Sequence, residues 1–183
     1  MGKWEILNSH YLFRRKWMNV REDRVRLPNG VTIEEFHVLE YPDWVCILPL
    51  TDDYNVVLVE HYRHGIGRLG VEFPAGVVDP GVSVEAAARR ELVEETGYEA
   101  SEFVSLGAVA PEPSRHSNFA HIMVASGATR VREPKPDDNE VITVRRWPIR
   151  DLVHLLEEEQ FVHSVHSVAI LRAHLAGLVD VRV

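Results

Sequence analysis

Three glutamates, Glu91, Glu94 and Glu95, end the predicted helix in "VEAAARRELVEETG", just before Gly97. On a helical wheel at about 100° per residue, they share one face and continue a stripe of small apolar residues. A carboxylate near a helix C-terminus costs about 0.3–1 kcal/mol, and like charges four residues apart repel each other. A divalent cation would offset both costs, and Mg²⁺ prefers oxygen ligands. The pattern therefore predicts a metal site at the end of the helix.

The same helix carries its own start and stop signals. Ser83 is predicted as the N-cap and Gly97 as the C-terminal cap. Glu85, Arg89 and Thr96 form a separate face that is predicted to be solvated, with an ion pair between Glu85 and Arg89. The competing interpretation makes the three glutamates a solvated charged face as well. Their position on the apolar stripe argues against it.

Short β-rich runs surround this helix. Alternating apolar and polar residues flank the turn Pro28-Asn29-Gly30, which predicts a hairpin, and residues 44–51 and 55–63 indicate a second one. Further helices are expected over 148–159 and from Ser164 to about Ala176. Strands dominate and helices interrupt them irregularly, which is typical of the α+β class.

The overall composition excludes several function classes. The chain has 183 residues, a formal net charge of -8 and a single cysteine, Cys46, in an apolar run where burial is expected. A general nucleic-acid binder needs a basic stripe, which this acidic chain lacks. No apolar run reaches the roughly 18 residues of a membrane span. A cytoplasmic protein without nucleic-acid or membrane partners is expected.

The histidines invite a zinc interpretation that their spacing does not support. His61 and His64 are three apart, as are His163 and His166. Neither pair has the additional Cys or His ligands of a structural zinc site. These histidines are therefore predicted to lie at the surface or at the edge of a substrate site.

The acidic segment resembles the sequence box of the Nudix hydrolase family. The matching positions are Gly76, Arg90, Glu91, Leu92, Glu94, Glu95, Gly97 and Tyr98. One position departs, because Val82 stands where the box has its first glutamate. The resemblance implies a mixed β-sheet sandwiched between α-helices, with an N-terminal antiparallel extension. It also implies a strand region over 1–44 that serves in dimerisation and a Nudix hydrolase domain over 45–183.

Other segments are similar to the ADP-ribose pyrophosphatase branch of that family. "VVLVEHYRHGIG" resembles its phosphate-contacting segment, with Arg63, and "VEFPAGVVDPG" resembles the segment that leads into the box. The resemblance implies a substrate role for Glu72, although a purely structural hydrogen-bonding role stays open. Pro113 matches a proline associated with ADP-ribose preference. Phe119 lies where a base-contacting pocket is expected.

This resemblance implies Mg²⁺-dependent hydrolysis, with Mn²⁺ as a possible substitute, of ADP-ribose to AMP and ribose 5-phosphate. Glu91, Glu94 and Glu95, with the backbone carbonyl of Ala75, would ligate the metal, and Arg90 would orient the carboxylates. Glu140 is the best match for a late acid, as a general base or a further ligand. Asp138 is the next candidate for that acid.

Two alternatives remain, and one prediction concerns assembly. The substrate can be another nucleotide sugar or a dinucleotide. The domain can also be a non-catalytic nucleotide sensor, which Val82 favours and the complete acidic cluster opposes. The N-terminal resemblance implies a homodimer.

Overall fold

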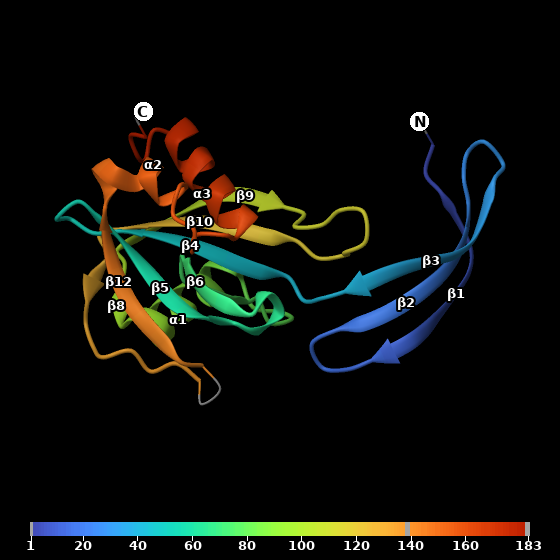
Figure 1. Ribbon diagram of the computed structural model, residues 1–183, viewed down its shortest axis with the longest axis horizontal. Helices are drawn as coiled ribbons and strands as arrows, with labels where there is room; N and C mark the ends of the chain where they lie inside the picture. Colours follow the sequence, from blue (N-terminus) through green and yellow to red (C-terminus); the bar gives the residue numbers. More distant parts are fainter. Residues whose placement is uncertain (1, 138–139, 182–183) are drawn as a thin grey trace. The chain divides into compact units, whose positions relative to one another are not determined.

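The computed structural model describes residues 2–137 and 140–181. The chain is divided into two compact units, whose helices and strands are labelled in Figure 1. The first unit comprises Met1–Asp43 with Ala110–Phe119, and the second comprises Trp44–Val109 with Ala120–Val183. Asp138, the second candidate for a late acid, lies outside the described residues.

The first unit is a three-stranded antiparallel sheet in the order β1-β2-β3. Its strands are β1 (Glu5–Arg14), β2 (Asn19–Arg26) and β3 (Thr32–Glu40). The predicted hairpin turn is confirmed between β2 and β3, where Gly30 has a φ of 87° that favours glycine. The segment Ala110–Phe119 joins this sheet through Leu39, whose N–H donates to the carbonyl of Arg115.

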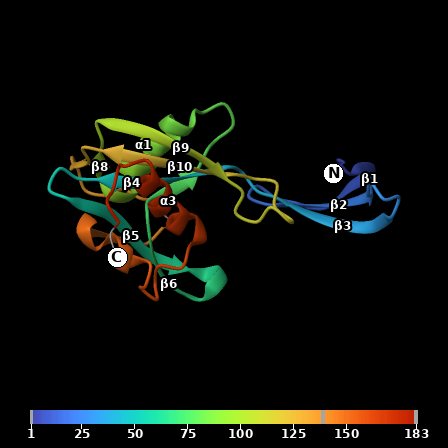
Figure 2. The same ribbon diagram turned by 90° about the horizontal axis from the view of Figure 1, so that it is seen from above.

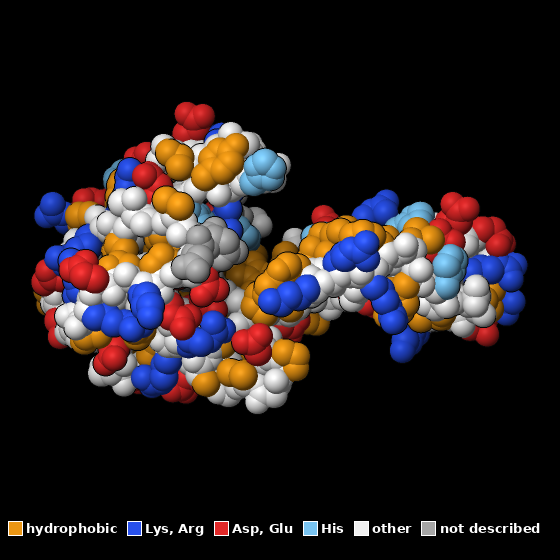
Figure 3. All heavy atoms as spheres, turned by 90° about the horizontal axis from the view of Figure 1, so that it is seen from below, with side chains coloured by type: hydrophobic (Ala, Val, Ile, Leu, Met, Phe, Trp, Pro, Cys, Tyr) orange, Lys and Arg blue, Asp and Glu red, His pale blue; other side chains and the backbone are white. Residues whose placement is uncertain are grey.

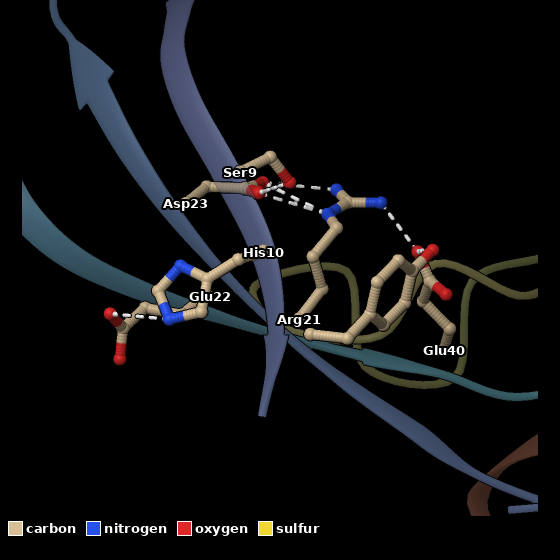
Figure 4. Close-up of polar contacts among 7 residues, drawn as sticks. Ser9, His10, Arg21, Glu22, Asp23 and Glu40 are labelled. Carbon is tan, nitrogen blue, oxygen red and sulfur yellow. Dashed lines mark hydrogen bonds and ion pairs between the residues drawn. The ribbon is translucent and has the colours of Figure 1, made fainter. Parts of the chain in front are cut away.

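A polar network crosses the strands of the first unit (Figure 4). Asp23 is 3% exposed and accepts hydrogen bonds from the Ser9 hydroxyl, at 2.6 Å, and from Arg21 Nε, at 3.0 Å. The Arg21 guanidinium also pairs with Glu40 on β3, at 2.5 Å. These contacts lower the pKa of Asp23 against the opposing effect of its burial. The network therefore links β1, β2 and β3, and the charges of Asp23 and Arg21 are paired within the first unit.

The second unit is built on a mixed sheet in the order β12-β5-β4-β10-β9, with β6 paired to β5 and β7 paired to β4. Its strands are β4 (Trp44–Leu50), β5 (Asn55–Arg63), β6 (Arg68–Glu72), β7 (Ala75–Val77), β9 (Glu102–Val109), β10 (Ala120–Ser126) and β12 (Ile142–Pro148). β4 and β10 run parallel, whereas the other pairs are antiparallel. A short separate pair joins β8 (Tyr98–Glu99) to β11 (Thr129–Arg130).

The helices cover both faces of this sheet (Figure 2). Along β4, Val45 and Ile47 pack with the apolar side of α1 (Val84–Thr96). The alternate residues, including Cys46, pack with α2 (Leu152–Leu155) and α3 (Ser164–Leu175) on the other face. Successive strand residues point to opposite faces, so one strand serves two cores. The predicted α+β class, with a mixed sheet between helices and an N-terminal antiparallel extension, is confirmed.

Helix α1 begins and ends at the predicted residues. The Ser83 hydroxyl accepts the N–H of Ala86, and Gly97 adopts a left-handed φ of 74°. The expected pair between Glu85 and Arg89 is present at 2.8 Å. The predicted exposure of Thr96 is wrong, since this residue is fully buried. Its hydroxyl accepts the Tyr98 N–H because the chain folds back over the helix end after Gly97.

The helix expected over 148–159 is much shorter than predicted. Only a 3₁₀ turn over Ile149–Asp151 and the helical turn of α2 form. Residues 157–159 are three consecutive glutamates, whose mutual repulsion disfavours further helix at its negative C-terminal end. The last predicted helix is confirmed as α3. A 3₁₀ turn, η1 (His64–Ile66), follows β5. Within the described part of the chain, no helix has the length and apolar character needed to span a membrane.

Candidate active site

The acids at the end of α1 differ in burial. Glu95 is 4% exposed, the Glu91 side chain is 13% exposed and the Glu94 side chain is 40% exposed. Burial raises the pKa of Glu95 well above its ordinary value. Burial, with the charges of nearby acids, also raises the pKa of Glu91 to about 7. The helix therefore places carboxylates where their charged forms are disfavoured and where a cation would stabilise them.

The segment after β6 lies against these acids. The N–H of Ala75 donates to Glu95 Oε2 at 3.0 Å, and the carbonyl of Pro74 accepts the N–H of Ile47 at 2.9 Å. The Ala75 backbone is thereby held beside a buried carboxylate. The Ala75 carbonyl, which the family resemblance implies as a metal ligand, therefore belongs to a segment that hydrogen bonds hold on two sides, at Glu95 and at Ile47.

Gly76 leaves the space that the Glu91 carboxylate occupies. A Cβ built on Gly76 would lie 2.0 Å from the carboxyl carbon of Glu91, which is far inside van der Waals contact. A larger residue at this position would therefore displace the Glu91 carboxylate from its present place.

Replacing Gly76 with alanine is expected to reduce turnover by about tenfold or more, the usual effect of displacing groups that support a metal ligand. The thermal midpoint should change little, because the end of the Glu91 side chain can move at low cost. Steady-state kinetics and thermal unfolding measure the two effects. Gly65→Ala is the matched control, since a Cβ there meets nothing within 4 Å. Full activity in Gly76→Ala would contradict the placement of Glu91.

Arg90 links the box loop to the helix acids. Its Nη2 donates to the Val77 carbonyl at 3.0 Å and pairs with Glu91 Oε1 at 2.9 Å. Its Nη1 pairs with Glu94 Oε2 at 3.3 Å. Asp79 Oδ2 is 3.6 Å from Nη2, so the loop retains an acid beside Arg90 although Val82 replaces the box glutamate. The sequence did not single out Asp79; its place in the same loop, three residues before Val82, was the available signal.

Arg63 and Glu72 form an ion pair at the edge of the sheet. Arg63 Nε and Nη2 contact Glu72 Oε1 and Oε2, at 2.8 and 2.5 Å. Glu72 is 1% exposed, and burial alone would raise its pKa, but its hydrogen bonds from Arg63 and the nearby His61, 3.7 Å away, hold the pKa well below the usual range. These two hydrogen bonds use Nε and Nη2 of the Arg63 guanidinium and do not involve Nη1. Glu72 therefore has a structural partner, as the alternative interpretation of the sequence allowed.

Glu140, the candidate for a late acid, belongs to the same compact unit as α1. Its carboxylate accepts the Asp137 N–H at 3.2 Å. Its charge contributes to the raised pKa of both Glu91 and Glu95. Asp137 also acts on Glu91, and the sequence analysis missed it because the polar segment around it has no periodic pattern.

The remaining predicted substrate residues belong to the first unit. Pro113 and Phe119 are both exposed, and Phe119 is 49% exposed. The N–H of Phe119 donates to Asp43 Oδ1 at 2.8 Å. Pro113 and Phe119 thus belong to a different compact unit from the carboxylates of α1.

The residues present fit a divalent cation by their chemistry. Glu91 and Glu95 supply hard oxygen donors from half-buried and buried positions, and the missing Cβ of Gly76 makes room for the Glu91 carboxylate. Across residues 2–137 and 140–181, no three His, Cys, Asp or Glu side chains are grouped so that together they could hold a metal ion. Glu91 and Glu94 instead share the guanidinium of Arg90.

The raised pKa of Glu91 predicts how stability varies with pH in a chelating buffer. Between the ordinary pKa of 4.5 and about 7, the folded state binds more protons than the unfolded state. The contribution of Glu91 to stability should therefore fall as the pH rises from about 5 to about 8. The lowered pKa of Glu72 acts only below this window, but the lowered pKa values of His163 and His166 raise stability with pH up to about 6.5. The effect of Glu91 is therefore measured as a difference, and the thermal midpoint of the wild type should fall relative to that of Glu91→Gln as the pH rises. Equal slopes would contradict the raised pKa.

Comparison with known proteins identifies the family. Residues 40–166 match the description of the NUDIX domain, and residues 4–39 match the nucleoside diphosphate sugar hydrolase N-terminal domain. The ADP compounds hydrolase NudE of Escherichia coli K12 is 30% identical over 180 residues, which cover 97% of this chain and 96% of that protein. The ADP-sugar pyrophosphatase of Mus musculus is 38% identical over 171 residues, 85% of this chain and 78% of that protein.

A solved structure supports the same assignment. The crystal structure of an ADP compounds hydrolase superposes with a TM-score of 0.86 at 28% sequence identity and covers 98% of each chain. The match includes both the mixed sheet and the N-terminal strands. Since the NUDIX description covers more than half of the sequence and includes the helix with its acids, this chain belongs to the Nudix hydrolase family.

Proposed function

We propose that this protein hydrolyses ADP-ribose to AMP and ribose 5-phosphate with Mg²⁺, or with Mn²⁺ in its place. The observation that carries the proposal is the pair formed by half-buried Glu91 and buried Glu95, whose charged forms are disfavoured without a cation. The relatives named for ADP-ribose and ADP-sugar hydrolysis support the substrate class.

The proposed metal ligands are the carboxylates of Glu91, Glu94 and Glu95 and the carbonyl of Ala75. When bound, the ion supplies charge neutralisation for the diphosphate and acidifies a water molecule. Arg90 orients the carboxylates through its contacts with Glu91 and Glu94. Nearly all of the work of these residues is positioning and electrostatics.

The other proposed residues act on the substrate and on the proton. Arg63 uses its Nη1 to contact a phosphate oxygen, while Glu72 holds Nε and Nη2 of the same guanidinium in place. Glu140 accepts the proton of the attacking water or serves as a further ligand. The oxygen of that water bonds to phosphorus as the bridging P–O bond breaks. Phe119 and Pro113 are proposed to contact the ADP-ribose moiety.

Product analysis tests this function. Purified protein is incubated with ADP-ribose, with Mg²⁺ or with a chelator, and both AMP and ribose 5-phosphate are quantified. The proposal expects equal amounts of the two products, formed only with the metal. A panel of nucleotide sugars and dinucleotides is run in parallel. Faster turnover of another compound on that panel would replace ADP-ribose as the substrate.

A nucleotide sensor is the second candidate, because Val82 stands where the family box has a glutamate. The ion pair between Arg90 and Asp79 weakens this candidate, since the loop still has an acid at Arg90. No turnover on the whole panel, together with micromolar or tighter binding of ADP-ribose in calorimetry, would favour the sensor.

We also propose that residues 1–44 form a homodimer interface and that the protein is cytoplasmic, with no nucleic-acid partner. Large apolar side chains are exposed on the N-terminal strands and their connection, as Figure 3 shows for one face. Ile6 is 58% exposed, Leu12 53% and Trp17 57%. Exposed apolar surface of this kind marks interaction sites.

Gel filtration is expected to give about twice the monomer mass of 20.9 kDa. Ile6→Lys with Leu12→Lys should shift the protein to the monomer, because two buried charges in an interface are costly. Leu175→Lys is the control, since this residue of α3 is 76% exposed in the second unit. A wild-type mass equal to that of the monomer would contradict the proposed dimer.

A further inference from the structure

His166 lies in the interior, although the sequence predicted a surface or substrate-edge position. It is fully buried on α3. The centroid of its ring lies 5.8 Å from that of Phe73, 6.1 Å from that of Trp44 and 6.3 Å from that of Phe161. The rings of Phe73 and Phe161 are 5.7 Å apart. Its Nδ1 accepts the backbone N–H of Phe73 at 3.0 Å. The prediction failed because spacing along α3 does not reveal which strand end packs over the helix.

The protonation state of His166 suits it as an acceptor. Burial lowers its pKa to about 3, so the ring is neutral at physiological pH. With Nδ1 accepting, the proton resides on Nε2, which has no hydrogen-bond partner within the described residues. An apolar side chain would avoid this unpaired donor and suit the aromatic surroundings. The contact that only the imidazole provides is the bond to Phe73.

Phe73 lies in the chain between two residues of the candidate site, Glu72 and Ala75. It directly follows Glu72, which pairs with Arg63, and stands two residues before Ala75. On the C-terminal side of Phe73, the Pro74 carbonyl accepts the N–H of Ile47. The Ala75 N–H donates to the Glu95 carboxylate. Upstream, β6 ends at Glu72. The hydrogen bond from the Phe73 N–H to His166 therefore fixes the short stretch between Glu72, at the end of β6, and Ala75, whose carbonyl is the proposed metal ligand.

We propose that His166 is a positioning residue, which holds the backbone from Glu72 to Ala75 in place against the acids of α1. It touches neither substrate nor metal and acts through the Phe73 amide. This inference rests on the proposed function, because Ala75 and Glu95 are taken there as ligands of the divalent cation. It assigns to the C-terminal helix a part in metal binding.

Three variants test the proposal. His166→Asn retains an acceptor near the position of Nδ1, whereas His166→Met fills the space without a comparable acceptor. Val165→Ala is the matched control, because Val165 is 2% exposed on the same helix and its truncation also destabilises the core. Mn²⁺ binding without substrate is followed by the paramagnetic resonance of the free ion, alongside KM, kcat and thermal midpoints. His166→Leu replaces His166→Met if the latter does not fold.

The proposal expects an increase of about tenfold in the Mn²⁺ dissociation constant of His166→Met, which is typical for the loss of a supporting contact at a metal site. His166→Asn should recover most of the affinity, and Val165→Ala should lose stability without losing affinity. Wild-type affinity in the folded His166→Met variant would overturn this inference alone. A wild-type protein that binds no Mn²⁺ would overturn it together with the proposed function.

Discussion

Glu95→Gln is expected to lower kcat by about 10²–10³-fold, the range seen when one preorganised group that stabilises a transition state is removed. Glutamine has nearly the same shape, and its carbonyl oxygen can still accept the Ala75 N–H that Glu95 Oε2 accepts at 3.0 Å. The substitution therefore removes charge and leaves the backbone contact. The loss in rate would measure the need for a carboxylate at this buried position.

The same variant should be at least as stable as the wild type in a chelating buffer near pH 8. Burial raises the pKa of Glu95, so ionisation of this group in the folded state costs stability as the pH rises. A neutral amide does not ionise, and the cost disappears. Thermal unfolding with and without Mg²⁺ measures both effects. The wild type should gain stability on addition of the ion, and Glu95→Gln should gain much less.

Glu85→Gln is the matched control for this experiment. Glu85 lies on the same helix but pairs with Arg89, and its side chain is 49% exposed. Its kcat should stay within about threefold of the wild type, since exposed ion pairs contribute only about 0–1 kcal/mol. If Glu85→Gln loses as much activity as Glu95→Gln, the loss reports on the helix in general and not on a site.

Arg63→Ala is expected to destabilise the protein by about 3 kcal/mol, because it leaves the carboxylate of Glu72 buried without its partner. Glu72 is 1% exposed, whereas the Arg63 side chain is 43% exposed, which places the effect at the lower end of the usual range. For a chain of this size, the thermal midpoint should fall by roughly 6–12 °C. The KM for the diphosphate substrate should rise as well, since the proposed phosphate contact is lost.

A double variant separates the two roles of Arg63. Adding Glu72→Gln removes the buried charge, so Arg63→Ala/Glu72→Gln should recover much of the lost stability. The raised KM should remain, because no amide at position 72 can replace a guanidinium at a phosphate. Recovery of both stability and KM would show that Arg63 serves only to neutralise Glu72. A single variant as stable as the wild type would contradict the buried ion pair itself.

The sequence predicts the positions of α1 and of its acids because their signals are local. Ser83 and Gly97 act on adjacent backbone groups, and the apolar stripe that includes Glu95 follows helical periodicity. The pattern of strands was readable for the same reason. The pairing of β4 with β10, which is parallel and joins distant segments, has no comparable local signal.

The errors share a cause in long-range packing. Thr96 was predicted to be exposed from its place on the wheel, but the chain beyond Gly97 covers it. His166 bonds to Phe73, 93 residues earlier in the chain. Asp79 reaches Arg90 across a loop whose shape cannot be inferred from residue types alone. Each of these contacts depends on tertiary structure, so the parts of the site that come from different elements could not be derived from the sequence.

Anomalous diffraction from crystals grown with Mn²⁺ tests the central claim most directly, because it locates the ion without reference to activity. A peak is predicted about 2.1 Å from carboxylate oxygens of Glu91 and Glu95, a usual distance for a hard divalent ion, with the Ala75 carbonyl as a further ligand. The peak should be absent from Glu95→Gln crystals grown in the same way. Manganese bound only elsewhere, or an unchanged peak in the variant, would contradict the assignment of these glutamates as the metal site.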